Sequence, residues 1–298
     1  MKKIIFFILI IIIIFCPSSA NKLDIVENNN INLVINSEKI HLSSPIILSN
    51  SHILFPLREL CDNLSDANIN IIWDNKVQAV TILYSGKTLT LNLNSNIAKL
   101  NNTDILLPCS PLLYKNLTYI PIRMVGEFFD CTVIWDDNSK TAFIKDAINY
   151  FETKAFLDNI NNIVSNVHDV KIDVINEVNN MSFGNSIYID TKENKVMEKN
   201  ILNDTWHNSK ISLTGKNILE ESNYLSALAG GIELNKKLSN ENYYVYTGFF
   251  PTNSGKLACG KFYIDTNNLL LVKMISESEN SLGLLKQNVL FSYGISLI

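Results

Sequence analysis

Hydrophobic and polar residues alternate in several short stretches of the first half of the chain. Apolar side chains recur at every second position in 31–35, 80–84 and 89–93, which is the period of a half-buried strand. Polar sequences typical of hairpin turns separate such stretches: Asn36-Ser37-Glu38-Lys39, Ser85-Gly86-Lys87 and Asn101-Asn102. The pattern predicts antiparallel β-strands joined by tight turns.

A helical period interrupts these strands at two places. The apolar residues of 57–64 and 122–129 recur at intervals of three and four, which predicts two short helices. Pro56 and Pro121 stand just before them. Proline suits the first turn of a helix because its missing N–H would have no partner there.

The two helical stretches belong to a longer motif that occurs twice. In each copy, proline, an aliphatic residue and arginine are followed by the predicted helix and later by a Trp-Asp pair. Both arginines of the chain and two of its three tryptophans lie in this motif, so chance explains the similarity poorly. The motif residues are Pro56, Arg58, Trp73 and Asp74 in the first copy and Pro121, Arg123, Trp135 and Asp136 in the second.

The motif residues have two interpretations. The arginines could grip a carboxylate or glycan partner, and the tryptophans could be platforms for sugars. Alternatively, each arginine pairs with Asp74 or Asp136 to hold a helix against a strand, and each tryptophan fills the core with its N–H paired. We prefer the structural interpretation for both residue types, because arginine–carboxylate pairs and buried tryptophans are common in folded proteins.

The second half of the chain begins with a longer helical pattern. Phe156, Ile160, Ile163, Val164 and Val167 fall on one face, which predicts an amphipathic helix over roughly 149–167. Alternating strands then run to the C-terminus, with a hairpin at 265–268 and a short helix at 224–232. The overall fold class expected is α+β. An antiparallel β-rich module, built from the internal repeat with one short helix per copy, spans residues 31–146, and a helix-plus-antiparallel-meander domain spans 150–298.

The first twenty residues have the pattern of an export signal. Lys2 and Lys3 precede an apolar run over 4–15, and small residues at 18–20 predict cleavage after Ala20. This run is shorter than the ~20 residues that span a bilayer, and no later stretch is long enough. Lipidation at Cys16 is disfavoured because the bulky Phe15 precedes it. A signal peptide over 1–20 and a secreted or envelope-held bacterial protein are therefore expected.

Composition and charge exclude several function classes. The chain is 47% hydrophobic and 18% charged, as expected for a folded protein, and its net charge of −4 argues against a nucleic-acid partner. The four histidines are scattered at 41, 52, 168 and 207, and no metal, phosphate-loop or nucleophile-elbow motif occurs. Neither a catalytic site nor a cofactor nor a metal is predicted. Disulfides and free thiols remain alternatives for Cys61, Cys109, Cys131 and Cys259.

The repeated motif resembles the copper amine oxidase N-terminal domain-like family over about 31–146, a stalk module of secreted bacterial proteins. This resemblance implies a non-catalytic accessory role. The oxidases carry copper and a quinone in another domain, whose Asn-Tyr-[Asp/Glu] signature is missing here: 149–151, 223–225 and 242–244 begin with Asn-Tyr and fail at the third position. Copper also needs clustered imidazoles, which the sequence lacks.

The helix followed by a meander in 150–298 resembles the LolA/LppX-type lipoprotein-carrier half-barrel. That resemblance implies a curved sheet around a helix, with room for an acyl chain, whereas a filled core is the plainer interpretation. We therefore expect a non-catalytic envelope binding or scaffold protein whose partner is an envelope protein or wall polymer. A lipid or lipoprotein carrier is the alternative from another class, and an envelope hydrolase is a third.

Overall fold

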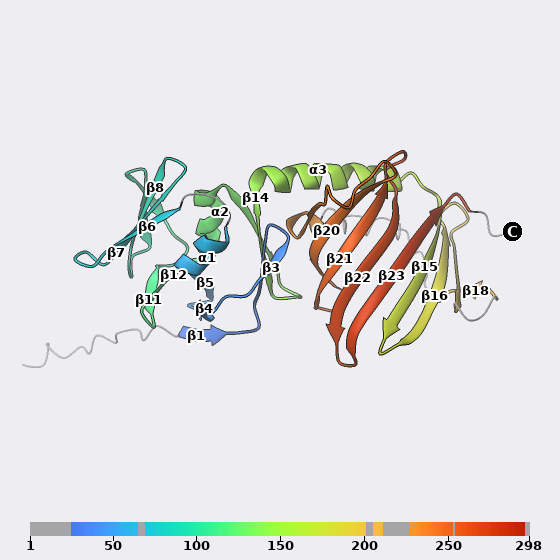
Figure 1. Cartoon of the computed structure of the whole chain (residues 1–298), viewed down its shortest axis with the longest axis horizontal. Coiled ribbons are helices and arrows are strands. Elements are labelled where there is room, and N and C mark those ends of the chain that lie inside the picture. Colours follow the sequence, from blue (N-terminus) through green and yellow to red (C-terminus); the bar gives the residue numbers. More distant parts are fainter. Residues whose placement is uncertain (1–24, 65–68, 201–204, 211–226, 253, 296–298) are drawn as a thin grey trace, which may run out of the picture.

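The computed structural model describes residues 25–64, 69–200, 205–210, 227–252 and 254–295. The predicted signal peptide and Tyr224 and Leu225 of the predicted short helix lie outside this range. Within it, the strands form four sheets, three from the first half of the chain and one from the second (Figure 1). The fold is therefore α+β and mostly β.

The first sheet contains five short strands, and β1 and β11 are its edges. In spatial order its strands are β1 (Ile25–Asn28), β4 (Ile46–Ser49), β5 (His52–Pro56), β12 (Leu117–Pro121) and β11 (Leu112–Tyr114). The second sheet is a five-stranded antiparallel meander with β6 at one edge. Its strands are β10 (Thr103–Leu106), β9 (Ile97–Leu100), β8 (Lys87–Asn92), β7 (Ala79–Tyr84) and β6 (Asn70–Asp74).

The third sheet contains the one parallel pair of strands found in the described residues. In spatial order its strands are β13 (Cys131–Asp136), β14 (Thr141–Asp146), β2 (Asn32–Ile35) and β3 (Glu38–Ile40). Strand β2 pairs with β14 in parallel, with Leu33 opposite Ala142. The prediction of a purely antiparallel module is wrong for this sheet. Strand β2 comes from far upstream in the sequence and pairs in parallel with the free edge of the β13–β14 hairpin.

Both motif segments fold as a hairpin, a seven-residue helix and a second hairpin. The helices are α1 (Leu57–Asn63) and α2 (Arg123–Phe129). Pro56 and Pro121 are the last residues of β5 and β12, and Pro56 is the N-cap of α1. The prolines therefore stand just before the first helical turn rather than within it. A common origin of the two segments stays a prediction.

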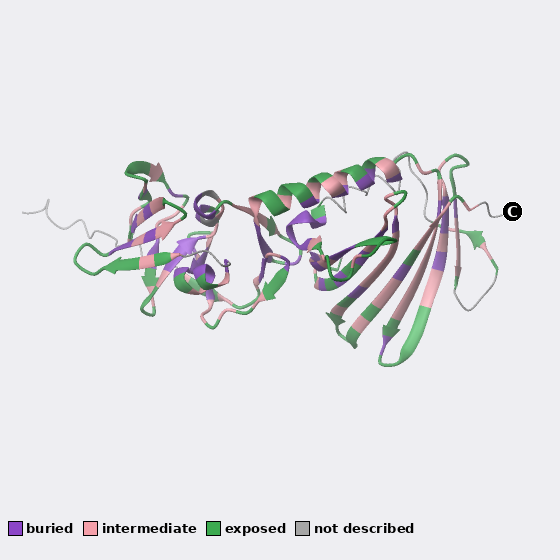
Figure 2. Cartoon of the chain, turned by 45° about the horizontal axis from the view of Figure 1, so that its top comes forward, coloured by how far each residue is buried: buried purple, intermediate pink, exposed green. Residues whose placement is uncertain are grey.

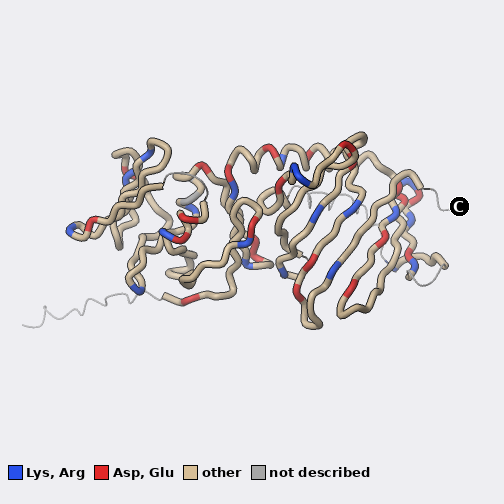
Figure 3. Tube along the Cα trace, in the orientation of Figure 1, with Lys and Arg blue, Asp and Glu red and all other residues tan. Residues whose placement is uncertain are grey.

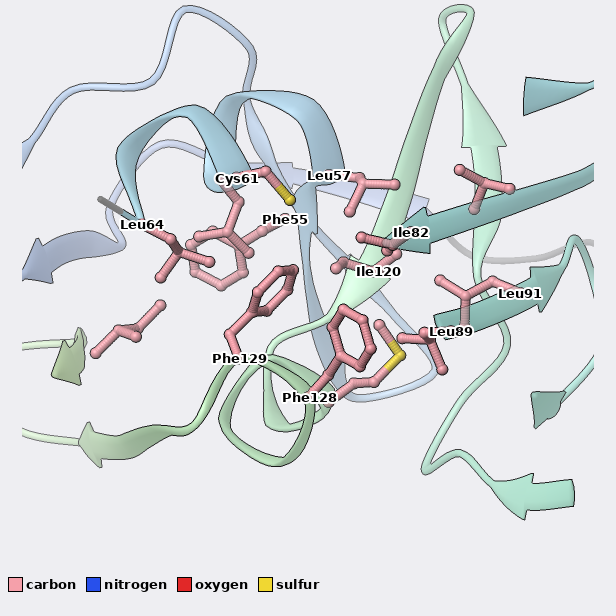
Figure 4. Packing of buried hydrophobic residues seen from close by; sticks show 14 of the residues in the cluster. Phe55, Leu57, Cys61, Leu64, Ile82, Leu89, Leu91, Ile120, Phe128 and Phe129 are labelled. Atoms are coloured by element: carbon pink, nitrogen blue, oxygen red, sulfur yellow. The ribbon is translucent and has the colours of Figure 1, made fainter. Parts of the chain in front are cut away.

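The core of the first half lies between the two short helices and the sheets. The rings of Phe128 and Phe129 meet edge-on with centroids 4.8 Å apart. Figure 4 shows them in one cluster with Phe55 of β5 and with aliphatic residues of α1 and of the meander. Burial of this apolar surface is the main stabilisation of the module.

The predicted hairpin turns are confirmed. Asn36, Ser37, Asn101 and Asn102 all have positive φ, between 45° and 69°, as two-residue turns of the mirror-image type require. Asparagine tolerates this conformation better than most residues. The turns therefore fix the register of the strands on either side.

The second half forms a nine-stranded antiparallel sheet partly covered by helix α3 (Ala147–Val164). In spatial order its strands are β18 (His207–Asn208), β17 (Lys195–Asn200), β16 (Met181–Asp190), β15 (Asp169–Val178), β23 (Gly283–Tyr293), β22 (Leu271–Asn280), β21 (Leu257–Asp265), β20 (Tyr243–Pro251) and β19 (Ile232–Leu234). The predicted helix is confirmed, although Leu157 is buried and Ile163 is only half-buried. The rings of Phe156 and Tyr246 stack with their centroids 5.3 Å apart, so this helix packs against β20.

The two halves meet around a buried lysine. Lys145, on β14, is 1% exposed. Its Nζ donates to the carbonyl oxygen of Ala229 at 3.1 Å, to that of Ile232 and to the Thr153 hydroxyl at 3.3 Å. Burial lowers the pKa of this ammonium group to about 8, although Glu233 and Asp146 oppose the shift. A charged donor is thus held by three oxygens of the second half.

Close backbone packing accompanies this contact. The 3-10 helix η2 (Leu228–Gly230) and Gly231 lie against Phe143 of β14. A Cβ atom on Gly231 would stand 1.9 Å from the Phe249 carbonyl oxygen and 2.8 Å from the Phe143 ring. Glycine at this position therefore permits the close approach. Within the described range, no helix combines the length and the hydropathy that a membrane span requires.

Candidate functional site

Pro56, Arg58 and Trp73 of the first motif copy border a pocket of about 570 Å³. The start of α1, the strands β6 and β7, and the β11–β12 hairpin surround it. Its lining includes the charged residues Arg58 and Glu59 and the apolar residues Ile71, Trp73, Val80, Leu113 and Leu117. Ligand sites typically combine such an apolar surface with a few polar groups.

Arg58 supplies the positive charge of this pocket. It lies exposed in the first turn of α1, directly after Leu57 turns into the core. No carboxylate among the described residues lies within ion-pair distance of Arg58 or Arg123. The predicted pairing of arginine with Asp74 or Asp136 is therefore wrong.

The two aspartates instead stabilise turns. Asp74 Oδ1 accepts from the Lys76 N–H at 2.8 Å, and Asp136 Oδ2 accepts from the Ser139 N–H at 2.7 Å and its hydroxyl at 2.6 Å. An aspartate that ends a strand commonly bonds the backbone two or three residues later. The Asp of the Trp-Asp pair thus closes its own hairpin and leaves the arginine for other partners.

Glu59, the acid next to Arg58, is also engaged elsewhere. Its carboxylate accepts from the Ser43 N–H at 2.7 Å, the Ser44 N–H at 3.3 Å and the Ser44 hydroxyl. Partial burial raises the pKa of Glu59, but the hydrogen bonds from Ser44 and Ser43 outweigh it and hold this pKa below its usual value. Glu59 fastens α1 to the preceding loop, a role that its sequence context gave no reason to expect.

The tryptophans are exposed rather than buried. Trp73 and Trp135 are each 39% exposed, so the prediction that they fill the core is wrong. Both lie on edge strands, β6 and β13, next to the aspartate that closes the hairpin. Trp135 Nε1 donates to Asp137 at 3.4 Å, whereas Trp73 presents its indole to the pocket.

The two copies of the motif thus differ in whether their arginine and tryptophan line this pocket. Arg58 and Trp73 line one pocket, while Arg123 and Trp135 do not line it. Leu113 and Leu117 complete the apolar wall, and sequence reasoning missed them because they belong to a distant hairpin. A guanidinium beside an indole and aliphatic side chains suits a ligand that joins a carboxylate to an apolar or flat surface.

The other titratable candidates are less organised. His207 of the edge strand β18 has its Nε2 3.7 Å from Glu198 of β17, and the His207 side chain is 62% exposed. Such exposure does not provide the enclosed setting that tunes a catalytic base. Among the described residues, no group of three or more His, Cys, Asp or Glu could hold a metal. Acidic and basic residues are interspersed along the chain (Figure 3).

Comparison with solved structures gives distant similarities that cover 49% of this chain. Lipoprotein LppX of Mycobacterium tuberculosis is 13% identical with a TM-score of 0.30, and 97% of it is covered. LprF of Mycobacterium bovis is 14% identical with a TM-score of 0.31, and 95% is covered. A LolA superfamily protein of Nitrosomonas europaea is 10% identical with a TM-score of 0.19, and 94% is covered.

Sequence comparison identifies the segment that contains the pocket. No curated protein matches the chain. The family described as copper amine oxidase N-terminal domain matches residues 34–144, which include both copies of the motif. The resemblance carried by the repeated Pro-x-Arg and Trp-Asp sequences is thereby confirmed: residues 34–144 are similar to the copper amine oxidase N-terminal domain.

Proposed function

We propose that this protein is an exported, non-catalytic binding protein of a bacterial cell envelope. Its first module binds a carboxylate-bearing partner in the pocket of Arg58 and Trp73. One observation carries the proposal: an exposed arginine without an acidic partner in the described structure and a half-exposed tryptophan line the same pocket. The match of residues 34–144 to an accessory domain, and not to a catalytic one, supports the non-catalytic role.

Calorimetric titration tests this binding. The probes are soluble acids on an apolar or sugar body, namely acyl dipeptides and uronic acids, each paired with its neutral amide. Loss of a charge-assisted hydrogen bond costs about 1.5–3 kcal/mol, so Arg58→Gln should weaken acid binding roughly 10- to 100-fold. Arg123→Gln is the matched control and should bind like the wild type. Equal binding of acids and amides, or no binding at all, would contradict the proposal.

The export part of the proposal rests on residues 1–20. A basic start, an apolar run and small residues before position 21 are the features that signal peptidase reads. Expression in a bacterium that secretes proteins, followed by intact-mass measurement, should give a chain that begins at Asn21. A full-length chain retained inside the cell would contradict export.

A second candidate function is carriage of an acyl chain by the nine-stranded sheet. Ile172 of β15 lies opposite Ile187 of β16 and Phe291 of β23, so these side chains share one face, and all three are half-buried. On the same face of β16, Phe183 is exposed. Figure 2 shows exposed positions toward the hairpin end of this strand. An apolar face of this kind favours an apolar ligand.

Native mass spectrometry after detergent-free purification tests the carrier function. Carriage predicts a stoichiometric lipid that Ile172→Glu removes. Ile175→Glu lies on the opposite face of the same strand and should retain the lipid. A mature protein that contains no lipid and takes up no added fatty acid would contradict carriage.

A further inference from the structure

The pocket is bordered by a strand edge that is open to a further strand. Strand β6 is the last strand of its sheet and pairs with β7 alone, from Asn70 opposite Leu83 to Asp74 opposite Ala79. In the described part of the chain, no strand pairs with its other side. Alternate residues of an antiparallel edge strand direct their N–H and C=O groups away from the sheet. Strand β6 therefore presents a row of hydrogen-bonding groups.

Within Asn70–Asp74, this edge lacks the usual protection against strand addition. Proteins commonly place lysine, proline or a bulge on an exposed edge. Over Asn70–Asp74 the sole charged residue is Asp74, which is engaged in its own turn. Ile72 and Trp73 are 49% and 39% exposed, so the edge is apolar on both faces.

A second edge strand also contributes to the lining of the same pocket. Among the described strands, β11 is the last of the first sheet and pairs with β12 alone. Its Leu113 is 46% exposed and lines the pocket together with Leu117 of β12. Trp73 and Leu113 thus provide apolar contacts from two different sheets, which suit the side chains of an added strand.

Arg58 determines the charge of the occupant. It lines the pocket together with Ile71 and Trp73 of β6 and has no carboxylate partner within the described structure. Glu59 also lines the pocket, but its carboxylate accepts hydrogen bonds from Ser43 and Ser44. A carboxylate on the ligand would complete its two-pronged donor geometry. A glycan would use the indole and the guanidinium but would leave the backbone groups of β6 unused, and a peptide uses all three features.

We infer that the pocket receives an extended peptide that pairs with the free edge of β6 and places a carboxylate on Arg58. The inference rests on the proposed function, because it names the class of acidic partner that the same pocket binds. Main-chain hydrogen bonds supply affinity in this binding mode, and the side-chain pockets supply specificity. Because β6 has five residues, a segment of about six residues matches its length.

Pools of synthetic peptides of about six residues, labelled with fluorescein, test the inference by anisotropy. Each peptide alternates Thr with Val or Leu, and one pool has Glu at each position in turn whereas its partner pool has Gln. The Glu pool should bind the mature protein, and the Gln pool should bind at least about 10-fold more weakly. Arg58→Gln should abolish this preference, while Arg123→Gln should keep it.

Backbone methylation separates strand addition from simple acid binding. Peptides of the Glu pool are N-methylated at alternate amides, in the two possible phases. Strand pairing predicts that one phase loses binding at least about 10-fold and that the other phase binds normally. If both phases bind like the parent and binding still needs Arg58, the peptide inference fails and the proposed acid binding stands. If no Glu peptide binds at about 1 mM while uronic acids do, strand addition also fails; if neither binds, both proposals fail.

Discussion

Arg58, at the start of α1, and Trp73, on the edge strand β6, line one pocket although they lie 15 positions apart in the sequence. Their counterparts Arg123 and Trp135 do not line it. The molecule thus contains an internal control for its own binding site. Substitution of one copy tests function, and the same substitution of the other copy tests general effects on the fold.

Replacement of Trp73 by alanine should affect binding more than stability. The indole is already 39% exposed, so we expect Trp73→Ala to lower the free energy of unfolding by about 1 kcal/mol. Acid binding should weaken at least about 10-fold because the flat apolar contact is lost. Urea unfolding and calorimetry measure the two effects. Trp135 has the same exposure, so Trp135→Ala is the matched control and should retain acid binding. Equal losses of affinity in the two variants would contradict binding in the pocket of Arg58 and Trp73.

Lys145 makes the stability depend on pH in an alkaline window. The pKa of this lysine is about 8 in the folded chain and 10.5 when unperturbed. Below about pH 8 both states hold the proton, and the cost of burying the charge is fully present. Between about pH 8 and 10.5 the unfolded chain binds the proton that the folded chain has released, so the free energy of unfolding rises with pH. The full rise is roughly 3 kcal/mol.

Urea unfolding at several pH values checks this dependence. Lys145→Met should remove the alkaline rise, because no buried ammonium remains. Lys261→Met, which removes an exposed lysine of β21, should preserve it. A rise of the same size in Lys145→Met would show that another group causes it.

The packing between the two halves should not tolerate a methyl group at Gly231. Its Cβ would overlap the Phe249 carbonyl oxygen at 1.9 Å and crowd Phe143. We expect Gly231→Ala to lower the free energy of unfolding by about 2–4 kcal/mol. A Cβ atom on Gly86 would meet no atom within 4 Å. Because φ is 78° at this position, Gly86→Ala should lower the free energy of unfolding by only about 1 kcal/mol. Denaturant unfolding that ranks Gly86→Ala as the more harmful change would contradict the packing.

The cysteines should react in the order of their exposure. The described residues include four free thiols, with Cys61 buried, Cys109 and Cys131 half-buried and Cys259 exposed. Burial raises the pKa of Cys61 to about 12 and that of Cys131 to about 11, which suppresses the reactive thiolates. A thiol reagent at pH 8 should modify Cys259 first and Cys61 only after unfolding. Recovery of fewer than four thiols from the unfolded, unreduced mature protein would reveal a disulfide.

Local patterns predicted the elements well, and the site poorly. The turns at Asn36-Ser37 and Asn101-Asn102 and the helix after Asp146 follow from neighbouring residues. The parallel pairing of β2 with β14 depends on contacts between distant segments, which no local pattern encodes. For the same reason, local sequence patterns did not identify Leu113 as a residue of the site.

The motif residues were found by repetition, but their roles depended on competition for partners. Asp74 and Asp136 bond their own turns in preference to an arginine. Strand position then decides the exposure of each tryptophan, because β6 and β13 are edges. A Trp that follows two aliphatic residues is the same in sequence whether its strand is central or at an edge, so burial could not be predicted.

The most direct test of the binding site uses the two arginines of the chain. Their side-chain Nε–H groups give one resonance each in a nitrogen-15 correlation spectrum of the mature protein, and Arg58→Gln assigns them. Titration with an acyl dipeptide acid should shift the Arg58 resonance and leave that of Arg123 in place, and the corresponding amide should shift neither. Equal shifts of both resonances, or no shift of Arg58 at saturating acid, would contradict binding in the pocket of Arg58 and Trp73.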